Sequence, residues 1–227
     1  MSLLDGIGRA LVIAPHPDDE VLGCGGTMAR LADMGREVHV AIVTRGMPPR
    51  FDPADVDVVR KEAEAAHALL GVRETHYLDL PAAELDGIPH SRLNEAISGL
   101  VAGLAPDSLF LPFIGDVHVD HQLIFTSGMV AARPRGGGYP ARIYAYETLS
   151  ETNWYAPYVT PAFCPNVFVD ISTVLSRKLG AFQCYRSQVQ AFPDERSVET
   201  LEALARLRGS TVFRAAAEAF VLVRGVG

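Results

Sequence analysis

The sequence predicts an α/β fold, in which an open and mostly parallel β-sheet carries helices on both of its faces. Three observations favour this class. Short apolar runs alternate with longer amphipathic segments, the chain has 227 residues, and no long linker or internal repeat divides it. The alternation is typical of parallel βαβ units. The length suits a single domain over residues 1–227.

The apolar runs give the predicted strands, because short runs rich in Val, Ile, Leu and Phe are typical of buried strands. Four such runs lie at residues 10–14, 38–44, 76–80 and 108–113. Helical segments are predicted between them, at residues 27–34, 57–70 and 92–104. Gly35 and Gly71 follow the first two of these segments, where a glycine commonly ends a helix.

Elements in this order indicate a Rossmann-like, doubly wound sheet. Ligands of such sheets bind beyond the carboxyl ends of the strands. The loops to inspect for function are therefore those that begin at Pro15, Arg45, Pro81 and Ile114.

Composition excludes several classes of function. The formal net charge of −7 argues against nucleic acid or an anionic membrane as a partner, because phosphate groups select for a basic surface. Three cysteines without a CxxC pair indicate neither a disulfide framework nor a thiolate zinc site. The apolar run at residues 10–14 is too short for a signal sequence or a membrane span. We therefore expect a cytoplasmic protein, and the sequence leaves open whether it forms a homo-oligomer.

The first loop reads Pro15-His16-Pro17-Asp18-Asp19-Glu20 and runs into a glycine-rich stretch. A dinucleotide site would need a third glycine where Met28 stands, and three carboxylates beside a pyrophosphate would repel it. Acidic residues at the start of a helix also serve as caps. Capping does not explain the histidine and the rigid proline, whereas His and Asp side chains together suit zinc or a similar divalent metal.

A second cluster follows the predicted strand at residues 108–113, where the chain reads Asp116-Val117-His118-Val119-Asp120-His121. Two histidines and two aspartates within six residues are difficult to explain by packing. The cluster lies at the same predicted edge of the sheet as the first loop. Catalytic zinc sites use three protein ligands and leave one position open. The two loops together therefore predict a metal-dependent hydrolase.

These two motifs resemble those of the PIG-L/LmbE-like de-N-acetylase family, which has A-H-P-D-D-E after a strand and H-P-D-H later in the chain. Here Pro15 is inserted before the histidine of the first motif, and Val119 replaces the proline of the second. Further likeness is carried by residues 60–64, 77–81, 169–171, 185–188 and 217–220.

The resemblance implies roles for six residues. His16, Asp19 and His121 would bind the metal, which we expect to be Zn²⁺, with Fe²⁺ or another divalent ion as alternatives. Asp18 would be the general base. His118 would stabilise or protonate the intermediate, with stabilisation of the oxyanion requiring its protonated form. Asp120 would support a histidine.

Substrate-binding residues are harder to assign. The family resemblance makes Arg60 a candidate for contact with a sugar or a phosphate. Arg45 lies in the loop after the second predicted strand and is a candidate for contact with an anionic group. His90 is a candidate for the rim of the site. For both arginines the alternative is a solvated surface position. His39, His67 and His76 lie outside the candidate loops, and we expect them to be structural. Cys24 is expected to be a small packing residue in a glycine turn.

Together these features predict a metal-dependent hydrolase that removes the N-acetyl group from an N-acetylated amino sugar. The family resemblance implies an N-acetylglucosamine-type glycoconjugate as the small-molecule substrate. Two alternatives remain: a hydrolase of another small amide, and a sugar or nucleotide-sugar binding domain without catalysis. A binding module has no need of a second carboxylate next to a ligand, and this favours the enzyme.

Overall fold

The computed structural model describes residues 3–135, 138–154, 156 and 158–227. The strands are β1 (Arg9–Ala14), β2 (Glu37–Arg45), β3 (Glu74–Pro81), β4 (Ser108–Pro112), β5 (Arg142–Tyr146), β6 (Val167–Asp170) and β7 (Ala217–Gly225). The α-helices are α1 (Asp19–Asp33), α2 (Pro53–Leu70), α3 (His90–Leu104), α4 (Val119–Ala131), α5 (Leu175–Cys184) and α6 (Val198–Ser210). No helix in the described part of the chain is long and apolar enough to cross a membrane.

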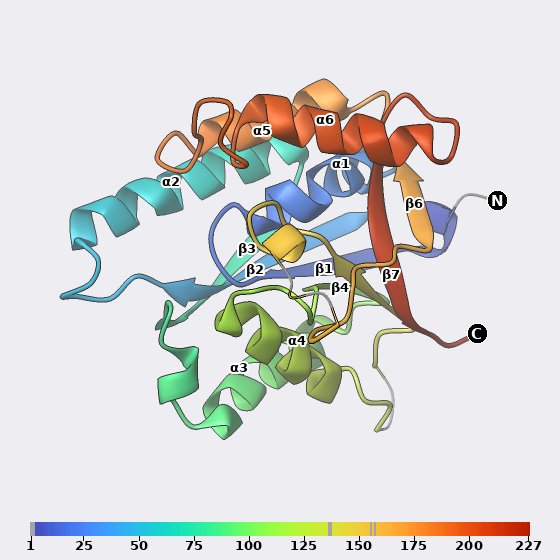
Figure 1. Cartoon of the computed structure of the whole chain (residues 1–227). Coiled ribbons are helices and arrows are strands. Elements are labelled where there is room, and N and C mark those ends of the chain that lie inside the picture. The colour runs from blue at the N-terminus through green and yellow to red at the C-terminus, as the bar shows by residue number, and fades with distance from the viewer. Residues whose placement is uncertain (1–2, 136–137, 155, 157) are drawn as a thin grey trace.

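The seven strands form one sheet in the order β3-β2-β1-β4-β5-β7-β6. Neighbouring strands from β3 to β5 are parallel, and β7 is antiparallel to both β5 and β6. The predicted open, mostly parallel α/β sheet is confirmed (Figure 1).

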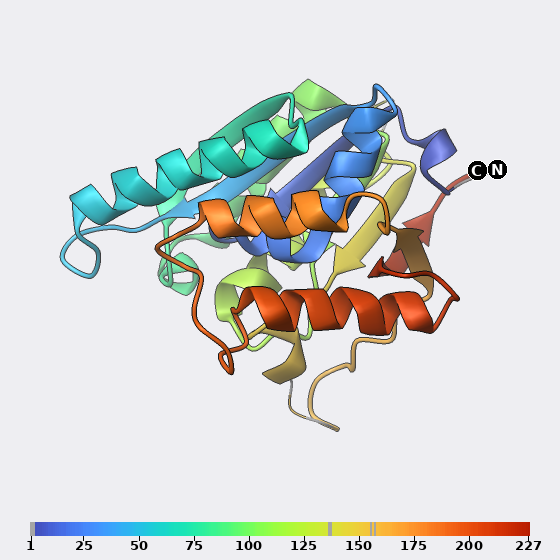
Figure 2. The same ribbon diagram turned by 90° about the horizontal axis from the view of Figure 1, so that it is seen from above.

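Helices cover both faces of the sheet. α1, α2, α5 and α6 lie on one face, and α3 and α4 lie on the other (Figure 1). Figure 2 shows α5 between α2 and α6 in the layer above the sheet. Side chains of β1 alternate between the two cores: Val12 packs under the α1 face, and Leu11 and Ile13 pack against the α3–α4 face. Alternation of this kind is expected of a strand buried on both sides.

The glycine-rich stretch differs from the prediction, because it lies inside α1 rather than in a turn before it. Glycine weakens a helix interior, which is why the sequence pattern placed helical structure only from Thr27 onward. Packing explains its presence here. A Cβ at Gly23 would lie 2.3 Å from the ring of Tyr146, and one at Gly26 would lie 2.6 Å from Ile171. The glycines let α1 approach its neighbours closely, and Cys24 is buried among them.

The strand order reverses direction between β1 and β4. The chain moves outward from β1 through β2 to β3 and then returns to the other side of β1. In doubly wound sheets the crevice beyond the carboxyl ends of the strands at this switch point is the usual ligand site. The two predicted motifs follow β1 and β4, so the fold brings them to the same crevice.

Candidate active site

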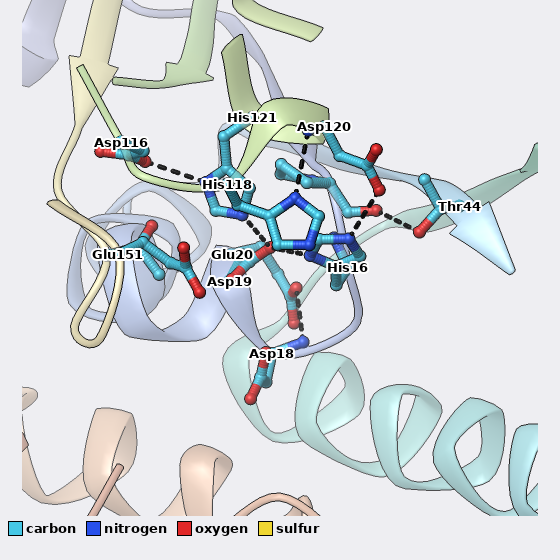
Figure 3. Close-up of polar contacts among 12 residues, drawn as sticks. His16, Asp18, Asp19, Glu20, Thr44, Asp116, His118, Asp120, His121 and Glu151 are labelled. Carbon is cyan, nitrogen blue, oxygen red and sulfur yellow. Dashed lines mark hydrogen bonds and ion pairs between the residues drawn. The ribbon is translucent and has the colours of Figure 1, made fainter. Parts of the chain in front are cut away.

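The two motif loops meet at the switch point, and Figure 3 shows their side chains facing one another. The first loop is fixed to β2 through the carbonyl oxygen of Pro15. This oxygen accepts hydrogen bonds from the backbone N–H and the hydroxyl of Thr44, at 3.1 and 2.8 Å. The second loop ends in His118, whose ring caps α4.

Asp18 takes an unusual backbone conformation just before α1, with φ of 103°. Non-glycine residues rarely adopt such angles, and those that do cluster at functional sites. Glu20 holds this turn: its Oε2 accepts the backbone N–H of Asp18 at 3.1 Å. Its Oε1 accepts hydrogen bonds from the hydroxyl of Tyr185 and from Nε2–H of His67. Glu20 therefore points away from the site and supports the loop from behind.

Three side chains converge on one point in the crevice. Oδ2 of Asp19 lies 3.4 Å from Nδ1 of His16 and 3.3 Å from Nε2 of His121. The other ring nitrogens donate outward, His16 to Asp120 at 3.1 Å and His121 to Asp116 at 2.9 Å. Metal-binding histidines commonly donate their second N–H to a carboxylate in this way.

The donor set fits a divalent metal. Bond lengths of about 2.0–2.2 Å in a tetrahedral zinc site place neighbouring donor atoms about 3.3–3.5 Å apart, which matches the separations around Asp19. Within the described residues, Oδ1 of Asp19 and Nε2 of His121 are buried and have no hydrogen-bond partner. Buried polar atoms without partners are costly. A cation at this point would satisfy both.

Without a metal, protons occupy the same site. Burial disfavours a charged imidazole, but hydrogen bonds to Asp120 and Asp19 outweigh burial and raise the pKa of His16 to about 9. For His121, burial is outweighed by the charge of Asp19 and the bond to Asp116, which raise its pKa to about 10. For Asp19, burial is outweighed chiefly by His121, so its pKa lies well below the ordinary value. The Asp19 carboxylate is therefore anionic, and the two protonated histidine rings beside it supply the positive charge that a bound cation would supply.

A second trio, made of His16, His118 and Asp120, also gathers within ligand distance. Its members already have other partners. Oδ2 of Asp120 accepts the backbone N–H of Ala83 at 2.7 Å and the ring of His16. Nδ1 of His118 accepts the backbone N–H of Asp120 at 3.1 Å. In the first trio, Oδ2 of Asp19 accepts the backbone N–H of His16 at 2.9 Å, but Oδ1 of Asp19 and Nε2 of His121 are buried without a partner among the described residues, and we therefore favour it.

Asp18 lies beside this trio and is bound by an arginine. Nη1 of Arg196 donates to Oδ2 of Asp18 at 2.8 Å, and no described residue donates to the buried Oδ1. Burial raises the pKa of Asp18 well above its ordinary value, and the charge of Arg196 opposes that rise. One oxygen is thus anchored while the other remains able to accept a proton.

The contacts of His118 favour a neutral ring over the protonated form that the family resemblance led us to expect. Its Nδ1 accepts the backbone N–H of Asp120, which leaves Nε2 to carry the ring proton. Burial and the charge of His16 also lower the pKa of His118. The side chain lines the crevice, so it presents a hydrogen-bond donor without a full positive charge.

A cavity of about 620 Å³ opens from these residues. His16, Asp18 and His118 line it, and an apolar wall comes from β2, β3, α2 and the loop before α2. That wall is made of Ile42, Phe51, Val56, Val58, Val59 and Tyr77.

Two of the three predicted substrate contacts line the cavity. Arg45 lies on its wall. Arg60 also lines it, stacked over the ring of Tyr77 at 4.1 Å and paired with Asp79. His90 is exposed at the start of α3 and is not among the described residues that line the cavity. The structure therefore does not bring His90 to the site.

Sequence reasoning missed three residues of the site. Asp116 belongs to the second cluster and received no role, although its spacing to His121 would allow contact. Glu151 lines the cavity with a buried oxygen, Oε2, that has no partner in the described part of the chain. Arg196 is 178 residues from Asp18, and no motif in the sequence connects them.

Comparisons with known proteins show which family the chain belongs to. The family model described as "PIG-L: GlcNAc-PI de-N-acetylase" matches residues 11–132. A diacetylchitobiose deacetylase of Thermococcus kodakarensis is 32% identical over 203 residues, which cover 83% of this chain and 72% of the relative. A 2'-N-acetylparomamine deacetylase of Streptomyces fradiae is 28% identical, with 86% and 77% covered.

A similar solved structure is that of the N,N'-diacetylchitobiose deacetylase from Pyrococcus horikoshii. It superposes with a TM-score of 0.77 at 26% identity, and the match covers 98% of this chain and 86% of that one. The matched family region contains both motif loops and the strands that carry them. The chain therefore belongs to the PIG-L family of GlcNAc-PI de-N-acetylases.

Proposed function

We propose that this protein hydrolyses the acetamide of an N-acetylated amino sugar and releases acetate and a free amine, with a divalent metal held by His16, Asp19 and His121. The observation that carries the proposal is the convergence of these three side chains beside Asp18. Family membership supports it. The relatives' names add that they deacetylate diacetylchitobiose and acetylparomamine, both of them amino sugars.

The ligand types favour zinc among the divalent ions, because two imidazoles and one carboxylate form a common catalytic zinc set. Fe²⁺ would accept the same donors. A cation bound there supplies Lewis acidity, which lowers the pKa of water to about 7 in zinc hydrolases. Asp116 and Asp120 orient the two histidines so that each presents a lone pair to the ion.

Asp18 acts as the general base in this proposal. Its Oδ1 is buried and has no donor among the described residues, while Arg196 fixes the other oxygen. A carboxylate whose burial raises its pKa accepts a proton more readily than an exposed one. Because Asp18 lines the cavity and would carry the proton taken from water, we assign the same carboxyl group its delivery to the departing amine.

His118 stabilises the developing oxyanion through its Nε2–H. Its Nδ1 is held by the N–H of Asp120, so the ring is oriented before substrate arrives. Preorganised donors of this kind are a large part of the rate enhancement in acyl transfer. A neutral donor suffices for this role, and no protonation of His118 is needed.

The cavity supports a small glycoconjugate as substrate. Its volume of about 620 Å³ lies within the usual range for small-molecule sites, about 300–1,000 Å³. Arg45 and Arg60 line the same cavity and offer cationic contacts to the substrate.

Acetate release from a panel of N-acetylglucosamine conjugates tests the proposal. The metal-free protein is loaded with Zn²⁺ or Fe²⁺, and Asp18→Asn serves as a matched inactive control. We expect metal-dependent release that the Asp18→Asn variant loses. Release from simple amides but from no amino sugar would favour a different amidase. Binding of the conjugates without release by the loaded protein would favour a non-catalytic sugar-binding domain.

A further inference from the structure

A second cluster of potential metal ligands lies at the far end of the same strands. His39 is the third residue of β2, and Glu74 and His76 begin β3. In the parallel pairing of these strands, His39 is opposite Glu74, and Ala41 is opposite His76. Residues two apart on a strand point to the same face, so all three side chains share one face at the amino end of the strands. The catalytic cavity lies beyond the other end, where Thr44 lines it.

The donor atoms of this cluster are close together. Nδ1 of His39 lies 3.2 Å from Nε2 of His76, a hydrogen bond between the two rings that a metal bound to both nitrogens would replace. Oε2 of Glu74 lies 3.9 Å from that nitrogen of His39 and 3.8 Å from that of His76. The two rings are stacked, with centroids 5.5 Å apart.

The separation of the two nitrogens matches a shared metal. Zinc–nitrogen bonds of about 2.0–2.1 Å at a tetrahedral angle place the two nitrogens about 3.3–3.4 Å apart. His39 is only 5% exposed and is therefore fixed by packing. The Glu74 side chain is 59% exposed, so it can move the short distance needed to complete the set.

Nearby positive charges are already paired. Glu37 binds Arg9 at 2.6 Å and Arg73 at 3.0 Å. These arginines therefore oppose a cation beside His39 less than free ones would.

We propose that His39, Glu74 and His76 form a second metal site, separate from the catalytic one, that takes zinc or a similar borderline-soft divalent ion. Two imidazoles and one carboxylate are its ligands, and its remaining position is open to water. The ion joins β3, an outer strand of the sheet, to β2. Its function is structural, because it fastens an outer strand to the rest of the sheet.

Equilibrium dialysis of the metal-free protein against Zn²⁺, followed by elemental analysis, tests this inference. We expect two zinc ions per chain in the wild type and one in His76→Ala, which should keep its deacetylase activity. His90→Ala is the matched control, because it removes an exposed histidine outside both clusters, and it should keep two ions.

Equal zinc content in the wild type and in His76→Ala would overturn the second site. This comparison does not depend on the proposed catalytic metal, because His16, Asp19 and His121 are the same in both proteins. His76 is partly exposed, with 17% of its side chain accessible, and thermal unfolding of the metal-free variant checks that it folds. In the wild type, added zinc should also raise the unfolding temperature more than it does in His76→Ala.

Discussion

Replacing Arg196 by methionine tests whether Asp18 is the general base. The Asp18 side chain is fully buried, and the bond from Nη1 of Arg196 to its Oδ2 measures 2.8 Å. Burial already raises the pKa of Asp18, and Arg196 opposes that rise. Arg196→Met removes the opposing charge, so the pKa of Asp18 should rise further.

The size of the expected pKa shift follows from the strength of the hydrogen bond between Arg196 and Asp18. Hydrogen bonds to charged groups contribute about 1.5–3 kcal/mol, which corresponds to about 1–2 pKa units. A base must be ionised to act, so activity is lost as the pH falls through its pKa. The acidic limb of the kcat–pH profile of the metal-loaded enzyme should therefore move upward by about 1–2 pH units.

A matched control separates this effect from general damage. Arg208 is paired with a carboxylate elsewhere, Glu147, through two hydrogen bonds, and its side chain is 24% exposed against 21% for Arg196. Arg208→Met should leave the acidic limb of the profile in place. Arg196 also lines the cavity, so KM is expected to change and kcat is the decisive quantity. An Arg196→Met profile that is lower at every pH but unshifted would refute the reasoning.

Three further predictions concern the proposed metal ligands His16, Asp19 and His121 and their neighbours. Asp18→Asn should keep the metal and lower kcat about 10²-fold or more, whereas Asp19→Asn should lose metal in elemental analysis; the reverse pattern would exchange their roles. His118→Ala should keep the metal and lower kcat about 10²–10³-fold, and loss of metal would make His118 a ligand instead. At pH 7.5, metal uptake should release about two protons, because His16 and His121 are protonated in the metal-free protein, with pKa values of about 9 and 10, and must bind as neutral rings. Calorimetry in buffers of different ionisation enthalpy measures this number, and a value near 0.2, expected for two histidines with pKa values of about 6.5, would contradict it.

The first half of the fold was predictable because its strands are short apolar runs and two of its helices show helical periodicity. The second half was harder. α4 begins inside the second motif, and its sequence VDHQLIFTSGMVA has apolar residues on several sides. Its periodicity therefore did not identify it as a helix. β7 is inserted between β5 and β6 in antiparallel orientation, an arrangement that no local pattern specifies.

The residues of the candidate site likewise fall into those that the sequence could predict and those that it could not. Residues that act within one motif could be proposed from spacing, since a strand end and a rigid turn bring His16 and Asp19 together. Arg196 could not, because it reaches Asp18 from a loop that only the complete fold brings there. The protonation of His118 also depended on the structure, since its Nδ1 accepts an N–H only after α4 has formed.

The three consecutive acidic residues illustrate how the fold gives similar groups different chemistry. Asp18, Asp19 and Glu20 are all completely buried, and burial of an unpaired carboxylate is costly. Asp19 faces two imidazoles of the motif loops and Asp18 faces one guanidinium. Glu20 faces a tyrosine hydroxyl, the imidazole of His67 and a backbone N–H.

These partners determine what each carboxylate can do. The imidazoles keep Asp19 anionic, as a metal ligand must be. Asp18 has one oxygen without a donor from the described residues, so it can exchange a proton. Glu20 uses its hydrogen bonds to hold the loop in place. Its bond to the N–H of Asp18 offsets the strain of the Asp18 backbone, which is about 1–3 kcal/mol. The positive φ that Glu20 supports is what turns neighbouring Asp18 and Asp19 toward different partners.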